Sequence, residues 1–299
     1  MPRFICMPAC MAPRRLAFAL LPLASMGLAM GGSGSGGSAR DANLELCDAP
    51  LGSQVLQANT LQLPAAAIWL DSTQIHWPQS KTQLKLGQSN AWRLLASRSG
   101  ALQIQVGQQP AGHDQSWILL GQRETRQMPA LSSADLRALH TSQLVLVQED
   151  IDGRVQQATR VQAAKALDAL FAPASLEAQL GANINAQAKA IGKIASNTHF
   201  AVWAPTAHNI SVCLFPNAKA KASAQLPLKR DDLSGVWRVQ THSAPAGTYY
   251  RYAVEVFVPG VGRVINHVND PYAVSLSANS LRSYVADLNA PHLKPANWD

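Results

Sequence analysis

The feature that most constrains this chain of 299 residues is a strand pattern in its C-terminal part. The opposite faces of a strand receive successive side chains, so an apolar residue at every second position predicts one buried face. That pattern is present at Tyr250, Tyr252, Val254, Val256 and Val258. The other face carries Tyr249, Arg251 and Glu255 and is expected to point outward. The pattern therefore favours an all-β domain.

Other short strands are predicted on either side of this pattern. Two further apolar groups predict buried faces, one at Ile210, Val212 and Leu214 and one at Trp237 and Val239. Turn-forming residues separate the strands, at Asp231, Asp232, Gly235, Pro245 and Gly247. Several short strands with turns between them are typical of a β-sandwich, and we expect one of immunoglobulin type here.

An earlier region is also predicted to consist mainly of strands. Its short apolar runs are 68–70, 82–86, 92–96, 102–106, 117–120, 144–149 and 155–161. Asp152-Gly153 supplies the positive-φ positions that a tight hairpin needs. Ser132 with Asp135 three residues later predicts a capped helix. The hairpin acids Glu149, Asp150 and Asp152 could be a carboxylate pair, but a solvated turn is the favoured interpretation.

The aromatic composition changes between the two regions. From 44 to 161 the aromatic residues are four Trp without Tyr or Phe, whereas 199–299 contains five Tyr, three Phe and three Trp. The Ala-rich stretch between them predicts a helix over 165–171 that stops at Pro173, a second helix from Ser175 capped by Gly181, and a loop over 183–197. The expected fold class is all-β, with two consecutive β-sandwich domains joined by a short helical linker. The predicted boundaries are 44–165, 166–198, 199–290 and a lead-in at 291–299.

The N-terminus is predicted to be a targeting signal. Arg14-Arg15 precede an apolar run of about a dozen residues and then small residues, which is the pattern of a secretory signal peptide over 1–29. A Gly/Ser-rich linker follows over 30–43. The apolar run is too short to span the ~30 Å of a bilayer core, so no transmembrane segment is expected. The sequence predicts a secreted or periplasmic protein.

The charge and the cysteine content restrict the classes of partner that we expect for this chain. The first 29 residues hold three of the 25 basic residues and no acid, which leaves 22 basic against 18 acidic residues. No stripe of Lys and Arg remains, so no nucleic-acid partner is expected. Cys47 and Cys213 fall in different predicted domains. A bridge between them stays open outside the cytoplasm, although unpaired cysteines are favoured. The scattered His residues predict neither a metal site nor a cofactor site.

Motifs of the second region resemble a known family. They are Leu180-Gly181-Ala182, the run from Phe200 to Ala207, Gly235-Val236-Trp237 and Gly247 to Tyr252. In order and content they resemble a family-48 carbohydrate-binding module, which precedes the barrel in family-13 glycoside hydrolases. Asn269 to Ala273 and Leu276 to Ser280 resemble the exit segment of pullulanase-type debranching enzymes. The segments 67–71 and 76–78 resemble, more weakly, the extra N-terminal domain of secreted bacterial pullulanases.

The resemblance implies hydrolysis of α-1,6-glucosidic branch points in starch-like or pullulan-like α-glucans. A retaining enzyme of this kind needs two carboxylates roughly 5–5.5 Å apart. In the family they lie on a (β/α)8 barrel, which is expected C-terminal to Asp299. The family's barrel motifs are absent from the sequence, so we assign no catalytic residue. The alternatives are a free-standing glucan-binding or adaptor module, and support domains that bind no ligand.

An α-glucan is the expected polysaccharide partner, and four residues are its candidate contacts. Sugars stack on exposed aromatic rings while polar neighbours bond their hydroxyls. Tyr249 with Arg251 and Glu255 is the first candidate, and Trp77 in an apparent turn is the second. Trp203 and Trp237 are interpreted as core residues. Glycogen-binding members of the family place a Trp after the strand at Ile210, where this chain has 216–219 without one, which favours a packing role.

Overall fold

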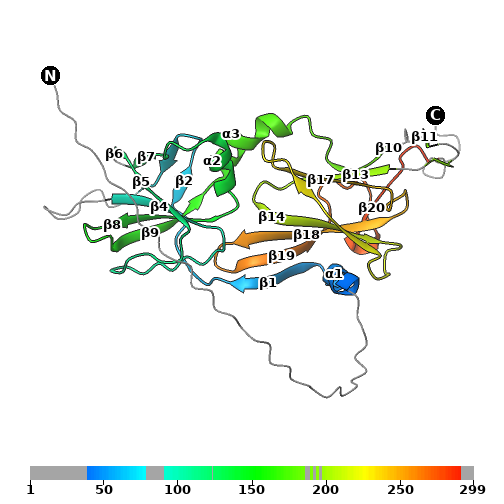
Figure 1. Ribbon diagram of the computed structural model, residues 1–299, viewed down its shortest axis with the longest axis horizontal. Helices are drawn as coiled ribbons and strands as arrows, with labels where there is room; N and C mark the ends of the chain where they lie inside the picture. Colours follow the sequence, from blue (N-terminus) through cyan, green and yellow to red (C-terminus); the bar gives the residue numbers. More distant parts are fainter. Residues whose placement is uncertain are drawn as a thin grey trace, which may run out of the picture. The chain divides into compact units, whose positions relative to one another are not determined.

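The fold is described here from a computed structural model, which covers residues 39–78, 91–122, 124–185, 189–190, 193–194 and 197–290. Two groups of strands dominate it, as Figure 1 shows, and the expected all-β class is confirmed. The predicted strand at 82–86, the signal peptide and the segment 291–299 lie outside the described residues.

The first sandwich contains eight strands hydrogen-bonded in the order β5-β4-β8-β9-β2-β3-β7-β6. All of its strand pairs are antiparallel except β2 with β9. Its strands are β2 (Ala67–Trp69), β3 (Gln74–His76), β4 (Ala91–Ser97), β5 (Gln115–Leu119), β6 (Gly121–Gln122), β7 (Thr125–Gln127), β8 (Gln143–Glu149) and β9 (Val155–Gln162). The predicted hairpin turn between β8 and β9 is confirmed, with Gly153 at φ 73°.

Tryptophan rings fill the core of the first sandwich. Trp69, Trp77 and Trp92 are buried there together with aliphatic side chains of β4 and β8. The helix α2 (Ser133–Leu139) adds Leu136 and Leu139 to this core. The predicted cap is confirmed, since Ser132 Oγ accepts a hydrogen bond from the Asp135 N–H at 3.1 Å.

Three local predictions in this part of the chain are wrong. Residues 102–106 do not form a strand and make only the isolated bridge between Gln103 and Ala111. The helix α3 (Ala164–Ser175) runs through Pro173 instead of stopping there, and the Leu176 N–H still reaches Ala172 O at 3.2 Å. Its Phe171 is fully buried, and burial of one large side chain can outweigh the hydrogen bond that a proline removes.

The third wrong prediction concerns the residues after α3. No second helix follows Ser175, and Gly181 begins a strand at φ 90° instead of capping a helix. Within the expected loop, β10 (Gly181–Asn185) pairs with β13 (Asn197–Trp203), and β11 (Lys189–Ala190) pairs with β12 (Lys193–Ile194). The segment between the sandwiches is therefore shorter than predicted.

The second sandwich has two sheets. One has the order β10-β13-β17-β16, and the other has the order β1-β19-β18-β14-β15 with β20 also on β18. Its other strands are β14 (Ala207–Phe215), β15 (Ala224–Pro227), β16 (Lys229–Arg230), β17 (Val236–Thr241), β18 (Tyr249–Val258), β19 (Gly262–Val268) and β20 (Ser283–Tyr284). The core between the sheets includes Phe200, Ile210, Val212, Tyr250 and Tyr252. The predicted buried face of β18 is thus confirmed in its first half, whereas Val256 and Val258 are only half-buried.

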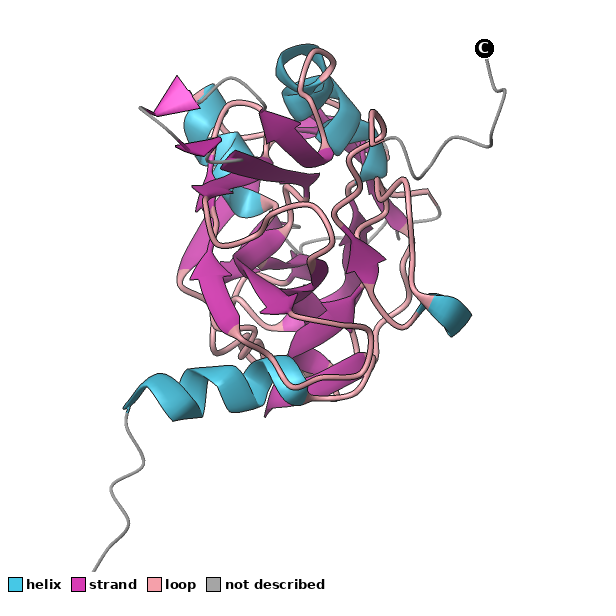
Figure 2. Cartoon of the chain, turned by 90° about the vertical axis from the view of Figure 1, so that its right-hand side faces the viewer, coloured by secondary structure: helices cyan, strands magenta, loops and turns pink. Residues whose placement is uncertain are grey.

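The N-terminal segment packs on the second sandwich, although it precedes the first in the sequence. The strand β1 (Gly52–Ala58) pairs antiparallel with β19, with Ser53 opposite Asn266. The helix α1 (Ala39–Asp48) contacts β15 and β18, and Figure 2 shows it at the border of the strands. The predicted start of the first domain at residue 44 therefore differs from the structure, in which that sandwich begins after β1.

Cys47 and Cys213 form a disulfide, with their Cα atoms 5.5 Å apart. The expectation of unpaired cysteines is wrong because it placed Cys47 in the first domain. In the structure Cys47 lies in the last turn of α1, and Cys213 lies in β14. The bridge attaches the N-terminal segment to the second sandwich.

Candidate functional site

The face of β18 that was expected to point outward is covered at its centre. Arg251 is only 6% exposed, and its Nη2 donates hydrogen bonds to the carbonyl oxygens of Cys47 at 2.8 Å and Ala49 at 2.9 Å. Its guanidinium also lies 5.2 Å from the ring centroid of Phe215. Burial lowers the pKa of Arg251 from its usual value. The end of α1 therefore encloses this side chain, and the expectation that it is open to a ligand is corrected.

The neighbours of Arg251 also have partners within the chain. The Tyr249 ring packs edge-on against Tyr284, with ring centroids 5.0 Å apart. Glu255 forms an ion pair with Arg263 of β19. The three predicted residues thus do not form one open platform. Tyr249 and Glu255 remain half-buried, and their contact with a glucan stays a prediction.

Trp77 belongs to the core of the first sandwich. It is 2% exposed and meets the Trp92 ring edge-on, with centroids 5.0 Å apart. The interpretation of Trp77 as a sugar platform in a turn is therefore corrected, because its ring faces other side chains. Trp237 is buried as predicted, and its Nε1 donates to Ala204 O at 3.0 Å.

The acids of the β8–β9 hairpin have separate structural roles. Glu149 is 2% exposed and accepts a hydrogen bond from Arg93 Nε at 2.9 Å, so the expectation of a solvated side chain is wrong for this residue. Asp150 Oδ1 accepts from the backbone N–H groups of Asp152 and Arg154 at 3.0 and 2.9 Å, which closes the turn. The hairpin is a structural unit rather than a carboxylate pair poised for catalysis.

A buried carboxylate that the sequence analysis did not single out joins two tyrosines. Tyr250 OH donates to Asp270 Oδ2 at 2.8 Å, and Tyr252 OH lies 3.4 Å from the same oxygen. The Asp270 N–H donates to Ser283 Oγ at 2.9 Å. Burial raises the pKa of Asp270 and of both tyrosines. The network fastens the segment after β19 to the core. The sequence analysis included Asp270 only as part of the exit-segment motif 269–273, and the one signal for its partners was two tyrosines on a buried face.

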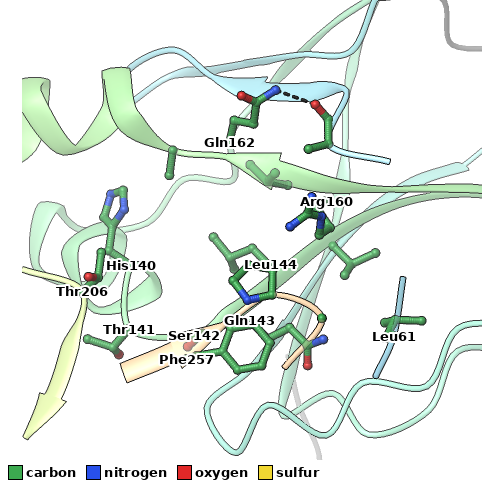
Figure 3. Close-up of a pocket in the computed structure, with 16 residues that line it drawn as sticks. Leu61, His140, Thr141, Ser142, Gln143, Leu144, Arg160, Gln162, Thr206 and Phe257 are labelled. Atoms are coloured by element: carbon green, nitrogen blue, oxygen red, sulfur yellow. Dashed lines mark hydrogen bonds between the residues drawn. The ribbon is translucent and has the colours of Figure 1, made fainter. Parts of the chain in front are cut away.

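A cavity of about 340 Å³ is lined by residues of both sandwiches. Figure 3 shows Leu144, Arg160 and Phe257 around it, with Gln162 bonded to the carbonyl oxygen of Ala65 on one side. None of its 16 lining residues carries a carboxylate. Hydrolysis of a glycosidic bond uses a pair of carboxylates, so this cavity is not equipped for that reaction.

His140 lies at one side of this cavity, as Figure 3 also shows. Its ring stacks on Trp69 with centroids 4.4 Å apart and meets Phe171 edge-on at 5.6 Å. Both ring nitrogens are buried without a hydrogen-bond partner among the described residues. Burial, with a smaller contribution from the Arg230 charge, lowers the pKa of His140 to about 4. The imidazole is therefore neutral near pH 7 and acts as a flat packing group.

The part of the chain that the structure describes contains neither a candidate metal site nor a candidate membrane-spanning helix. No group of three or more His, Cys, Asp or Glu side chains there is placed to hold a metal ion. No helix in the same part combines the length and the apolar composition needed to cross a bilayer.

Comparison with family models matches two segments. Residues 64–169 match the pullulanase N2 domain, and residues 179–273 match carbohydrate-binding module 48, the isoamylase N-terminal domain. The two matches correspond to the first sandwich with the first half of α3, and to most of the second sandwich without its N-terminal segment.

Comparison with individual proteins finds similarity to pullulanases. A pullulanase of Klebsiella pneumoniae is 33% identical over 247 residues, which cover 79% of this chain and 21% of the relative. Chloroplastic pullulanase 1 of Arabidopsis thaliana is 35% identical over 167 residues, 55% of this chain and 16% of the relative. The crystal structure of the Klebsiella pneumoniae enzyme complexed with maltotriose superposes with a TM-score of 0.66 at 30% identity, covering 79% of this chain and 22% of that one. The chain thus spans about one fifth of the length of the curated Klebsiella relative.

Proposed function

This chain carries a pullulanase N2 domain followed by a carbohydrate-binding module of family 48, and we propose that it is the non-catalytic N-terminal portion of a secreted pullulanase-type glycoside hydrolase. The substrate class is α-glucans of the starch and pullulan type, and the bonds cleaved are their α-1,6 branch points. The observation that carries the proposal is the 33% identity to a pullulanase that extends across both domains in one alignment of 247 residues.

The surface after β19 supports a role beside another domain. Large apolar side chains are exposed along this segment, at Tyr272, Val274, Leu276, Leu281 and Leu288. Exposed apolar residues that cluster in this way mark surfaces that pack against another domain or protein. Asp270 holds the start of this segment in place through its bonds to Tyr250 and Ser283. The proposal uses this segment as the platform for a catalytic barrel.

In this proposal the catalytic barrel, and not the described sandwiches, hydrolyses the glycosidic bond. The carboxylates described above close turns, form ion pairs or accept hydrogen bonds from buried tyrosines. The described sandwiches would instead hold the barrel and contact the polysaccharide, a partner that is consistent with the maltotriose bound by a Klebsiella pullulanase. Export through a signal peptide over 1–29 is part of the proposal and fits the disulfide between Cys47 and Cys213.

The test is the intact mass of the native protein in its source organism, combined with an assay on pullulan. A polypeptide several times longer than 299 residues that releases oligosaccharides from pullulan is the expected result. A native product of the length of this chain without activity would overturn the proposal. Retardation of that product in an amylopectin gel would then favour a free-standing glucan-binding or adaptor module, and no retardation would favour support domains.

A further inference from the structure

The first sandwich has another hollow, to which the comparisons assign no role. It has a volume of about 420 Å³ and lies between β5 and α2. Its lining includes Trp117, Arg98, Gln115, Asp135 and Ser142. The volume falls in the range of about 300–1,000 Å³ that is usual for small-ligand sites. We call this hollow the Trp117 cleft.

An indole ring at the wall of the Trp117 cleft is only partly covered. Trp117 lies in β5 opposite Leu94 of β4, and part of its ring packs against the Trp-rich core. The other three tryptophans described in this sandwich, Trp69, Trp77 and Trp92, are at most 2% exposed. Trp117 is thus the tryptophan of this group that lines the hollow, and the rest of its side chain packs against the core. A ring fixed in this way suits stacking on a ligand, because little side-chain freedom is lost on binding.

The polar residues of the cleft carry both signs of charge. Arg98 and Asp135 contribute one positive and one negative side chain, and Gln115 and Ser142 are neutral. Asp135 Oδ2 already accepts from Ser132 Oγ at 2.7 Å, which leaves the other oxygen for a ligand. Among the described residues, no carboxylate lies within ion-pair distance of the Arg98 guanidinium. Such a set offers donors and acceptors without a net charge, which disfavours an anionic ligand such as nucleic acid.

We propose that the Trp117 cleft binds a neutral saccharide, a segment of α-glucan chain. A sugar ring stacks its apolar C–H face on Trp117, while Arg98, Gln115 and Asp135 form hydrogen bonds with its hydroxyl groups. An aromatic platform with a few polar side chains around it is the arrangement that a polyhydroxylated ring requires. The choice of α-glucan among saccharides rests on the proposed function. The site gives the first sandwich a substrate-holding role of its own.

The experiment measures binding to the full chain. Retardation is followed in native gels that contain amylopectin, and tryptophan fluorescence is titrated with maltoheptaose. We expect Trp117→Ala to weaken binding by about tenfold or more, a loss typical of a central aromatic contact. Because Trp117 also touches the core, Arg98→Ala and Gln115→Ala at exposed positions provide a second, milder test, and each is expected to weaken binding severalfold.

The matched control is Ile118→Ala. Ile118 is the next residue of β5, so it points to the opposite face of the sheet, and it is 56% exposed. We expect this variant to bind as the unchanged chain does. The thermal unfolding of every variant is recorded so that a loss of binding is not mistaken for a loss of folding.

The outcomes separate this inference from the proposed function. Binding that survives Trp117→Ala, Arg98→Ala and Gln115→Ala overturns the site and leaves the proposed function standing. Binding of cellulose oligosaccharides in place of maltoheptaose overturns the α-glucan assignment. A chain that binds neither sugar overturns the site as well, whereas the proposed function is decided by native mass and pullulan hydrolysis.

Discussion

The two sandwiches belong to one fold class but are stabilised in different ways. The first is built from consecutive segments of the chain, and its core contains tryptophans and a neutral histidine stacked on one of them. The second takes a helix and an edge strand from residues 39–58, attaches them with a disulfide, and buries a tyrosine–aspartate network. The second sandwich therefore adds a covalent bond and a tyrosine–aspartate network to its apolar core, whereas the first has no covalent link among its described residues.

The difference shows what decides whether a candidate residue is accessible. Arg251 and Trp117 both lie in strands beside aromatic residues. A segment from elsewhere in the chain encloses Arg251, whereas no such segment among the described residues covers the hollow beside Trp117. Strand alternation tells which face a side chain is on. It does not tell what covers that face.

The largest expected effect concerns the disulfide of the second sandwich. Replacing both cysteines, Cys47→Ser with Cys213→Ser, removes a link between residues 166 positions apart. A link across so long a loop is worth about 5 kcal/mol of stability in the chain-entropy account. We expect the unfolding transition of the second sandwich to move to lower denaturant while that of the first stays in place. Urea titrations with and without reductant measure it, and a matching loss in both sandwiches would show that they do not unfold separately.

The next effect concerns acid and the first sandwich. The pKa of His140 is about 4 in the folded chain. The value for an unfolded histidine is about 6.5. Between these values the unfolded chain binds a proton that the folded chain does not, so stability is lost as the pH falls from about 6.5 to 4. The loss approaches about 3 kcal/mol at the acid end.

His140→Phe keeps a flat ring against Trp69 and removes the titrating group. We expect this variant to lose most of the acid sensitivity between pH 6.5 and 4, as measured by urea unfolding at both values. His113→Gln serves as the control, because His113 is an exposed histidine of the same sandwich. An equal acid sensitivity in His140→Phe would contradict the assignment.

A smaller effect is expected at Asp270. Asp270→Ala leaves the buried hydroxyl of Tyr250, and that of Tyr252, without their acceptor. Removing one partner of a buried hydrogen bond costs about 1–3 kcal/mol. The second sandwich should lose about 2 kcal/mol, and the first should lose none. Asp270→Asn keeps an acceptor oxygen and is expected to be milder, so the reverse order of the two variants would count against the network.

The smallest effect is expected at Tyr249. Its ring packs against Tyr284, and the neighbouring Arg251 is enclosed. We therefore expect Tyr249→Ala to change amylopectin retardation by less than about twofold, which corresponds to about 0.4 kcal/mol. A tenfold loss of binding would instead show that Tyr249 contacts the glucan, and both sandwiches would then have a glucan-binding role.

Local patterns predicted much of the fold. The alternation around Tyr250 identified the buried face of β18, Asp152-Gly153 identified a hairpin, and Ser132 identified the start of α2. Each of these depends on residues that are close together in the sequence. Backbone preferences and side-chain periodicity are sufficient in such cases.

The pairing of distant segments was beyond such reasoning. Cys47 can be paired with Cys213 only once the path of residues 39–58 is known. That path follows the edge of the second sandwich, where β1 pairs with β19. The burial of Arg251 follows from the same crossing. Trp77 was misjudged for a related reason, because Trp92, which covers its ring, comes from another strand of the sheet.

The position of β1 has a consequence for anyone who divides this chain into parts. Because Ser53 pairs with Asn266, the first sandwich is inserted in the sequence of the second and is not a separate domain that precedes it. A fragment that begins near residue 176 would lose β1 and α1, leave the edge of β19 unpaired and leave Cys213 as a free thiol. During synthesis the second sandwich can be completed only after more than 200 further residues have followed Ser53 out of the ribosome.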